Sequence, residues 1–266
     1  MTRNRWLAAT AGPAVLVGVL VMLAALVGTP GSWLTGYVSE AGTSGQPYAG
    51  AYRCGLVLLA LGVALLGSTL RRLRPVGALL LGAAVLAGVS AVVPCSRGCP
   101  LPPFASPTTA DVVHAAASIV GMVTLATAMV LVALTPALGC AARRLAVCAV
   151  ALVVPLGGCL GLTMLFIGRG PLNAALERLL LVIAVSWLIG TCLLTAGPPR
   201  APAAACTASS PAHALPPTRA WARPHRGSSA DPPDDRQQRF RDVLDGALRL
   251  EDQPVNGHDQ ADAEKR

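Results

Sequence analysis

Residues 112–134 read VVHAAASIVGMVTLATAMVLVAL, and this stretch decides the class of fold. It contains no Asp, Glu, Lys or Arg. A helix needs about 20 mostly apolar residues to cross the hydrocarbon core of a bilayer, and this run is long enough to do so. Five more runs of this kind lie between Trp6 and Ala196. So many apolar runs in so short a segment leave no polar surface for water, and the sequence therefore predicts a membrane protein.

The predicted fold is all-α: a polytopic six-helix transmembrane bundle followed by a disordered C-terminal tail. The predicted spans cover residues 6–27, 52–70, 76–93, 112–134, 145–167 and 174–196. The transmembrane domain is residues 1–196, and the tail is residues 197–266. The tail is rich in Pro, Ala and Ser, a composition that buries too little apolar area to offset chain entropy. Its residues 234–250 show helical apolar spacing, which fits a short amphipathic helix on the inner leaflet or on a protein partner, or a transient helix in a solvated tail.

The charges lie unevenly along the chain. Hydrophobic residues make up 53% of it and charged residues 13%, and the formal net charge is +8. Up to Ala196 there are eleven arginines and only three acids, Glu40, Asp111 and Glu177, so this part carries the whole excess. Arginines between long uncharged runs are typical of a polytopic membrane protein and not of the basic face of a nucleic-acid binder. We expect membrane lipids, and no nucleic acid, as partners.

The arginines also predict an orientation. Seven fall on one side of the predicted membrane: Arg3, Arg5, Arg71, Arg72, Arg74, Arg143 and Arg144. Four fall on the other side: Arg53, Arg97, Arg169 and Arg178. Cytoplasmic loops carry an excess of positive residues, so both termini are predicted to be cytoplasmic. Scarce Lys beside abundant Ala, Gly, Arg and Pro indicates a GC-rich bacterial genome, and the predicted location is the plasma membrane of a bacterium.

The outer side collects the candidate site residues, which are all polar or charged: Ser39, Glu40, Arg53, Asp111, His114, Glu177 and Arg178. Charged groups near or within spans are costly, and they usually have a partner or a function. One interpretation is a cluster that binds a ligand or senses conditions. The other is mutual neutralisation, with Glu177 and Arg178 pairing with Arg53 or Asp111.

Asp111 and His114 each have two interpretations. Thr108 and Asp111 form a Thr-x-x-Asp variant of the capping box, which places a carboxylate at the positive end of a helix. Asp111 therefore fits a cap as well as a site. His114 lies about one turn inside its span, where it either bridges to Asp111 or to a neighbouring helix, or acts as a proton-responsive or ligand-binding group. Ser118 shares their helical face, but three residues on one helix rarely converge as a catalytic triad must.

Cys95 and Cys99 are candidates for a disulfide. Three residues that include Gly98 separate them, and they lie on the predicted oxidising side. The alternative is a pair of zinc ligands, but a structural zinc site uses four Cys or His ligands and this side offers only His114 besides. We predict no metal site.

Together these motifs resemble those of the actinobacterial membrane proteins called domain of unknown function (DUF) 998. The resemblance covers about Trp6 to Ala196 and rests on these residues: Ser39 and Glu40 followed by Gly42 and Pro47; Arg53, Cys54 and Gly55; Pro94 and Cys95 through Cys99 and Pro100; Asp111 with His114; and Glu177 with Arg178. It implies six spans, a polar constellation on the outer side and no established activity.

Three functions compete. A non-enzymatic protein that binds a lipid or small ligand, or senses conditions, fits the one-sided polar residues. The alternative is a membrane-embedded, metal-dependent lipid hydrolase. It rests on a distant similarity of Ser39, Asp111 and His114 to site residues of alkaline ceramidases. Those enzymes also use further histidines, which the outer side of this protein lacks. A transporter would place polar residues at the midplane, which is nearly all apolar here. No phosphate loop, dinucleotide fingerprint, CxxC pair or haem motif occurs, so neither a cofactor nor a catalytic residue is predicted.

Overall fold

The computed structural model describes residues 3–29, 36–100, 106–135, 138–168 and 170–197. All of them belong to the first of the two units into which the chain divides, Met1–Ala208. The helices are α1 (Arg3–Gly28), α2 (Ala49–Thr69), α3 (Arg74–Val92), α4 (Thr109–Leu134), α5 (Gly139–Phe166) and α6 (Pro171–Ala196), with a short 3₁₀-helix η1 (Val38–Gly42) after α1. The described part of the chain contains no strand. The predicted all-α, six-helix fold is confirmed. The predicted tail beyond Gly197, including its amphipathic segment, lies outside the described residues.

Each helix begins before the apolar run that predicts it. α5 begins at Gly139, six residues before the predicted run, and includes Arg143 and Arg144. Both side chains are exposed, and Arg143 Nε donates to the carbonyl of Ala133 at 3.0 Å. Long basic side chains can keep their charge in water while the helix continues below them. Hydropathy therefore marks the apolar part of each helix rather than its hydrogen-bonded ends.

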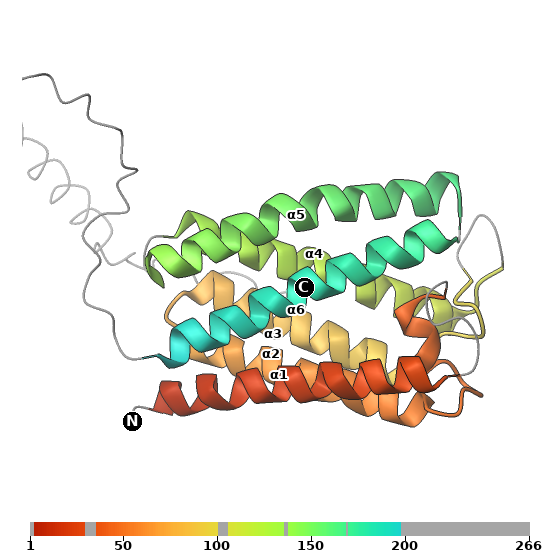
Figure 1. The fold of residues 1–266 in the computed structure, drawn as a ribbon, viewed down its shortest axis with the longest axis horizontal. Coiled ribbons are helices and arrows are strands. Elements are labelled where there is room, and N and C mark those ends of the chain that lie inside the picture. Colours follow the sequence, from red (N-terminus) through yellow and green to blue (C-terminus); the bar gives the residue numbers. More distant parts are fainter. Residues whose placement is uncertain (1–2, 30–35, 101–105, 136–137, 169, 198–266) are drawn as a thin grey trace, which may run out of the picture. The chain divides into compact units, whose positions relative to one another are not determined.

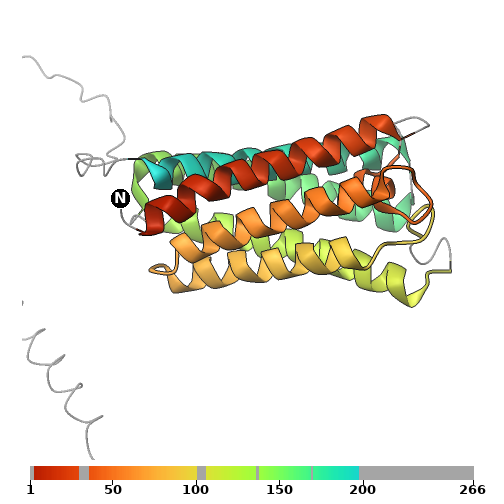
Figure 2. The ribbon, with the colours of Figure 1, turned by 90° about the horizontal axis from the view of Figure 1, so that it is seen from below.

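Consecutive helices pack side by side, and α1 also packs against α6 (Figures 1 and 2). Because neighbours run in opposite directions, the connections fall at two ends. We name as the polar end the one with the α1–α2, α3–α4 and α5–α6 connections, and as the tail end the one where α1 begins and α6 ends. Every predicted site residue lies at the polar end.

The bundle core holds small residues that allow close contact between helices. A Cβ on Gly18 of α1 would lie 2.6 Å from the carbonyl oxygen of Gly55 in α2, and a Cβ on Gly55 would lie 2.6 Å from that of Gly18. Gly62, two turns further along α2, faces Val15 in the same way. Small residues let helix backbones approach within a membrane, where burying apolar area drives association only weakly.

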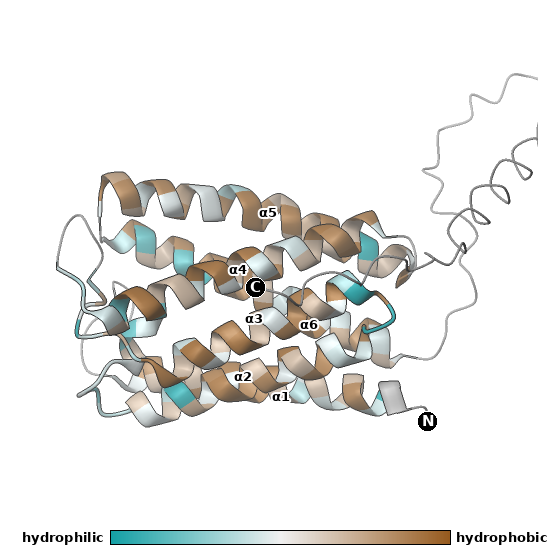
Figure 3. Ribbon diagram, turned by 180° about the vertical axis from the view of Figure 1, so that it is seen from behind, coloured by the Kyte–Doolittle hydropathy of each residue, from teal (hydrophilic) through white to brown (hydrophobic). Residues whose placement is uncertain are grey.

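The outer surface of the bundle is apolar. Large side chains such as Val85, Val123, Leu162, Val182 and Leu193 are at least half exposed. Figure 3 shows apolar residues along the helices and hydrophilic ones towards their ends. All six helices are long and apolar enough to cross a membrane. Exposed apolar side chains over this length suit lipid and not water, so the protein is a multi-pass membrane protein.

Candidate functional site

Asp111 joins the start of α4 to the α3–α4 connection. Its carboxylate forms the predicted capping box, accepting from the Thr108 backbone N at 2.8 Å and from Thr108 Oγ1 at 2.7 Å, while Thr108 Oγ1 accepts from the Asp111 backbone N. The same carboxylate accepts from Ser96 N at 2.6 Å and from Ser96 Oγ at 2.9 Å. Asp111 is buried, and four donors occupy its two oxygens. Its geometry is that of a structural anchor.

The segment that Asp111 holds is a tight turn closed by a disulfide. Cys95 and Cys99 are joined with their Cα atoms 5.1 Å apart, and Cys99 N donates to the Ser96 carbonyl at 2.9 Å. Gly98 and Cys99 both have positive φ, +87° and +40°. Glycine tolerates this left-handed conformation, whereas Cys99 adopts it at a steric cost. We call residues 95–99 the disulfide turn.

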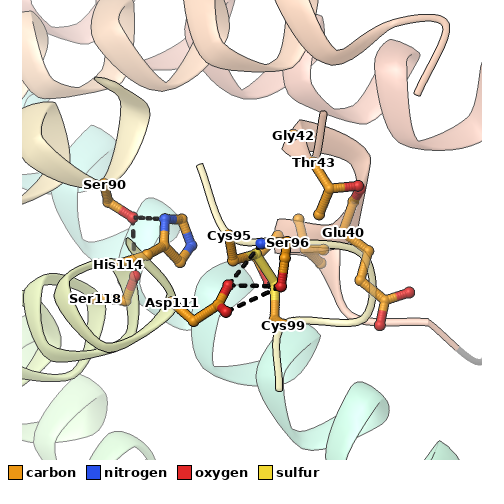
Figure 4. The surroundings of a disulfide bond; sticks show 12 residues. Glu40, Gly42, Thr43, Ser90, Cys95, Ser96, Cys99, Asp111, His114 and Ser118 are labelled. Atoms are coloured by element: carbon orange, nitrogen blue, oxygen red, sulfur yellow. Dashed lines mark hydrogen bonds between the residues drawn. A yellow bond between two sulfur atoms is a disulfide. The ribbon is translucent and has the colours of Figure 1, made fainter. Parts of the chain in front are cut away.

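His114 connects α4 to the end of α3. Its Nδ1 lies 2.8 Å from the Val93 carbonyl oxygen, which can only accept, so Nδ1 carries the proton. Ser90 Oγ lies 3.3 Å from the same nitrogen and 2.9 Å from Ser118 Oγ (Figure 4). With Nδ1 donating to a carbonyl, His114 cannot accept the Ser90 proton there as a base. The imidazole therefore bridges two helices.

The η1 segment is held by three charged side chains from α2 and α6. Glu177 Oε2 accepts from the backbone N of Val38, the first residue of η1, at 2.8 Å. At the other end of η1, Arg53 donates from Nε and from an Nη to the Gly42 carbonyl, both at 3.0 Å. Helix ends favour this arrangement, an acid at the amino end and a base at the carboxyl end.

Arg178 adds a third attachment just before η1. One Nη donates to the Gly36 carbonyl at 2.7 Å and the other to the Ala174 carbonyl at 2.9 Å. Val38 and Ala41 pack into a small apolar cluster with Met22 and Tyr52. The aromatic ring of Tyr52 lies so close to Gly42 that an added Cβ would meet it at 2.6 Å. Backbone and side-chain contacts together fix η1 against α1, α2 and α6.

The two anchored segments meet each other. Ser39 Oγ of η1 lies 3.9 Å from Cys99 Sγ, and because that sulfur is in a disulfide, Ser39 is the donor. Figure 4 shows the disulfide turn between Asp111 on one side and Glu40, half-buried in η1, on the other. We call η1 and the disulfide turn together the polar cap.

Arg53 and Asp111 bond to groups that carry no charge. Within the described ranges, the hydrogen bonds of Arg53 go to Gly42, and those of Asp111 go to Ser96 and Thr108. These bonds serve backbone groups of irregular segments near the membrane, which also need partners. Mutual neutralisation of the charged candidates stays a prediction.

Sequence reasoning missed two contributors, Ser90 and Ser96. Ser90 is buried inside an apolar run, where a single serine does not indicate any specific contact. Ser96 lies in the predicted cysteine loop, yet its partner Asp111 is 15 residues away and no local spacing indicates the contact. The signal that could have indicated Ser90 is its place in the last turn of α3, at about the same depth in the bundle as His114 near the start of α4.

The described residues contain no group of three or more His, Cys, Asp or Glu side chains that could hold a metal ion. Asp111 and His114, two of the three residues likened to those of lipid hydrolases, make no hydrogen bond to each other within the described part. Their contacts go to Ser96, Thr108, Ser90 and Val93. The geometry gives these residues anchoring roles.

Six apolar helices and a polar cap held by side chains of the bundle define a multi-pass integral membrane protein. Residues 10–194 match the model of a family described as "Protein of unknown function (DUF998)". The match covers more than half of the chain, which belongs to this family, and the resemblance seen in the sequence is confirmed. No curated protein and no solved structure matches the chain.

Proposed function

We propose that the protein is non-enzymatic and that its polar cap binds a lipid headgroup or a small polar ligand on the outer side of a bacterial plasma membrane. One observation carries this proposal. Half-buried side chains of α2 and α6, and the buried Asp111 of α4, hold both segments of the cap by direct hydrogen bonds to their backbones. A surface fixed in this way is preorganised, which reduces the entropy lost on binding.

Among the residues of the polar cap, Arg97 is the one best placed to contact a ligand. It lies in the disulfide turn between Ser96 and Gly98, and its side chain is exposed. It takes part in none of the hydrogen bonds found in the described portion of the chain. A guanidinium recognises phosphate or carboxylate groups through two parallel hydrogen bonds. An exposed arginine on an anchored turn therefore suits an acidic headgroup or ligand.

The arginine distribution supports the outward orientation of the cap. The tail end of the bundle carries Arg3, Arg5, Arg71, Arg72, Arg74, Arg143 and Arg144, whereas the described polar end carries Arg53, Arg97 and Arg178. The positive-inside bias then places the tail end in the cytoplasm. Both termini are cytoplasmic in this proposal, and residues 197–266 are available to a cytoplasmic protein partner.

Native mass spectrometry of the protein purified in mild detergent tests the binding proposal. The expected result is a co-purifying lipid or small molecule, distinguished by its mass, that is lost in Arg97→Gln. Glu40→Gln serves as a second cap variant. The matched control is Arg72→Gln, which removes an exposed arginine at the opposite end. Absence of any bound species, or equal retention in all variants, contradicts the proposal.

A further inference from the structure

Two polar side chains lie in the apolar core, far from the polar cap. The indole of Trp187 is 0% exposed and the side chain of Thr191 is 1% exposed, both on α6. Trp187 Nε1 and Thr191 Oγ1 have no hydrogen-bond partner among the described residues. A buried polar group without a partner is costly, and native proteins usually satisfy such a group with protein or with ordered water.

Thr191 behaves unlike the other helix threonines. Beyond the first helical turns, the described helices also contain Thr10, Thr69, Thr124, Thr127, Thr163 and Thr195, and each donates to a backbone carbonyl three or four residues earlier. That local bond is the simplest way to satisfy a hydroxyl in apolar surroundings. Thr191 does not form it, so its hydroxyl is directed elsewhere in the core.

The two groups can share one ligand. Residues four apart on a helix lie on the same face, with Cβ atoms about 5–6 Å apart. The indole N–H can only donate, whereas the hydroxyl can donate or accept, so the ligand must accept at least one hydrogen bond. Trp187 belongs to the apolar core cluster of the bundle, which also contains Val15, Leu66 and Met129, and such surroundings favour a neutral ligand.

This position is separate from the polar cap. Thr191 follows Glu177 by fourteen residues on the same straight run of α6, which corresponds to roughly 20 Å along the helix axis. The other buried polar side chains of the described residues are Thr43, Ser90, Asp111, His114 and Asn173, and all of them lie at the polar end. Figure 1 shows α6 passing beside α5, with its final turns at the tail end.

We propose that Trp187 and Thr191 bind an internal water molecule in the tail-end half of the bundle. The water accepts from the indole N–H and exchanges a hydrogen bond with the Thr191 hydroxyl. A water molecule is small, neutral and able both to donate and to accept, as the two side chains require. Through it, a polar contact forms inside a core that is otherwise held by apolar packing.

Ultraviolet resonance Raman spectroscopy of Trp187 tests this proposal, because one indole band reports whether the N–H is hydrogen-bonded. The full-length chain carries Trp6→Phe, Trp33→Phe and Trp221→Phe, which leaves Trp187 as its single tryptophan. The expected band is that of a bonded N–H. Thr191→Val, which removes the hydroxyl at nearly constant volume, is expected to shift the band towards the unbonded position.

Thr195→Val is the matched control, since the Thr195 hydroxyl bonds to the carbonyls of its own helix. It is expected to leave the Trp187 band unchanged. An unbonded N–H in the parent protein overturns the proposal, and this reading does not depend on any Thr191 variant folding. A bonded band that does not shift in Thr191→Val also overturns the proposal. So does a bonded band that disappears when lipid and detergent are exchanged, because this result identifies a lipid as the occupant.

Discussion

At the scale of single residues, Asp111 shows how a membrane protein uses a charge near its surface. Its carboxylate receives four donors from Ser96 and Thr108 and makes no ion pair within the described part of the chain. Hydrogen bonds to a charged acceptor are stronger than neutral ones, so loss of the carboxylate removes four strong bonds at once. Asp111 thus ties the disulfide turn to α4.

Asp111→Ala is expected to lower the free energy of unfolding by about 2–4 kcal/mol, because it removes a helix cap and the acceptor for Ser96. Asp111→Asn keeps one acceptor oxygen and is expected to lose less. Denaturant titration in mild detergent measures both. The control Arg97→Ala changes an exposed side chain in the same turn, and it should stay within about 0.5 kcal/mol of the parent. Equal losses for Asp111→Ala and Arg97→Ala would argue against an anchoring role.

Single residues also show which side-chain contacts can be predicted from the sequence. The capping box of Thr108 and Asp111 is local, with partners three residues apart, and so it can be predicted. The second partner, Ser96, and the contact of His114 with Val93 depend on how α3 and α4 pack. No spacing along one helix encodes such contacts. The candidate residues were therefore found by their chemistry, whereas their partners came from the structure.

At the scale of elements, the helices and the cap differ in how far the sequence predicts them. Each helix follows from a long apolar run, because only a helix satisfies all its backbone groups in lipid. The 3₁₀-helix η1 has no such signal. It is five residues long and is stabilised by side chains from α2 and α6, so the sequence predicts only a polar loop there.

Packing between α1 and α2 gives a prediction at this scale. Gly55→Ala places a Cβ 2.6 Å from the Gly18 carbonyl oxygen, so the two helices must separate. We expect a loss of about 1–3 kcal/mol in unfolding free energy, the usual cost of overpacking. Gly158→Ala on α5 is the control, because nothing lies within 4 Å of its added Cβ.

The same denaturant titration distinguishes the two glycine variants. Gly158→Ala should leave stability unchanged or raise it slightly, since alanine favours helix more than glycine does. If Gly55→Ala were as stable as Gly158→Ala, the close contact of α1 and α2 through glycine would be refuted.

At the scale of the whole molecule, the sequence predicts the number of helices and their alternating direction but not which helices touch. Every helix is apolar over most of its surface, so its pattern does not identify the packed face. The contact between α1 and α6 brings together the two ends of the bundle sequence, and it depends on shape rather than on hydropathy. This contact also lets Arg178 and Glu177 of α6 reach the segment that follows α1.

The proposed function requires above all that the polar cap face outward, and labelling of substituted cysteines in intact cells tests this directly. Ser44→Cys lies in the exposed segment between η1 and α2 at the polar end, and Arg72→Cys lies in the exposed connection at the tail end. Labelling by a membrane-impermeant maleimide is measured above that of the parent protein. We predict that Ser44→Cys is labelled in intact cells and that Arg72→Cys is labelled only after the cells are opened. Labelling of Arg72→Cys but not Ser44→Cys in intact cells would contradict an outward-facing cap.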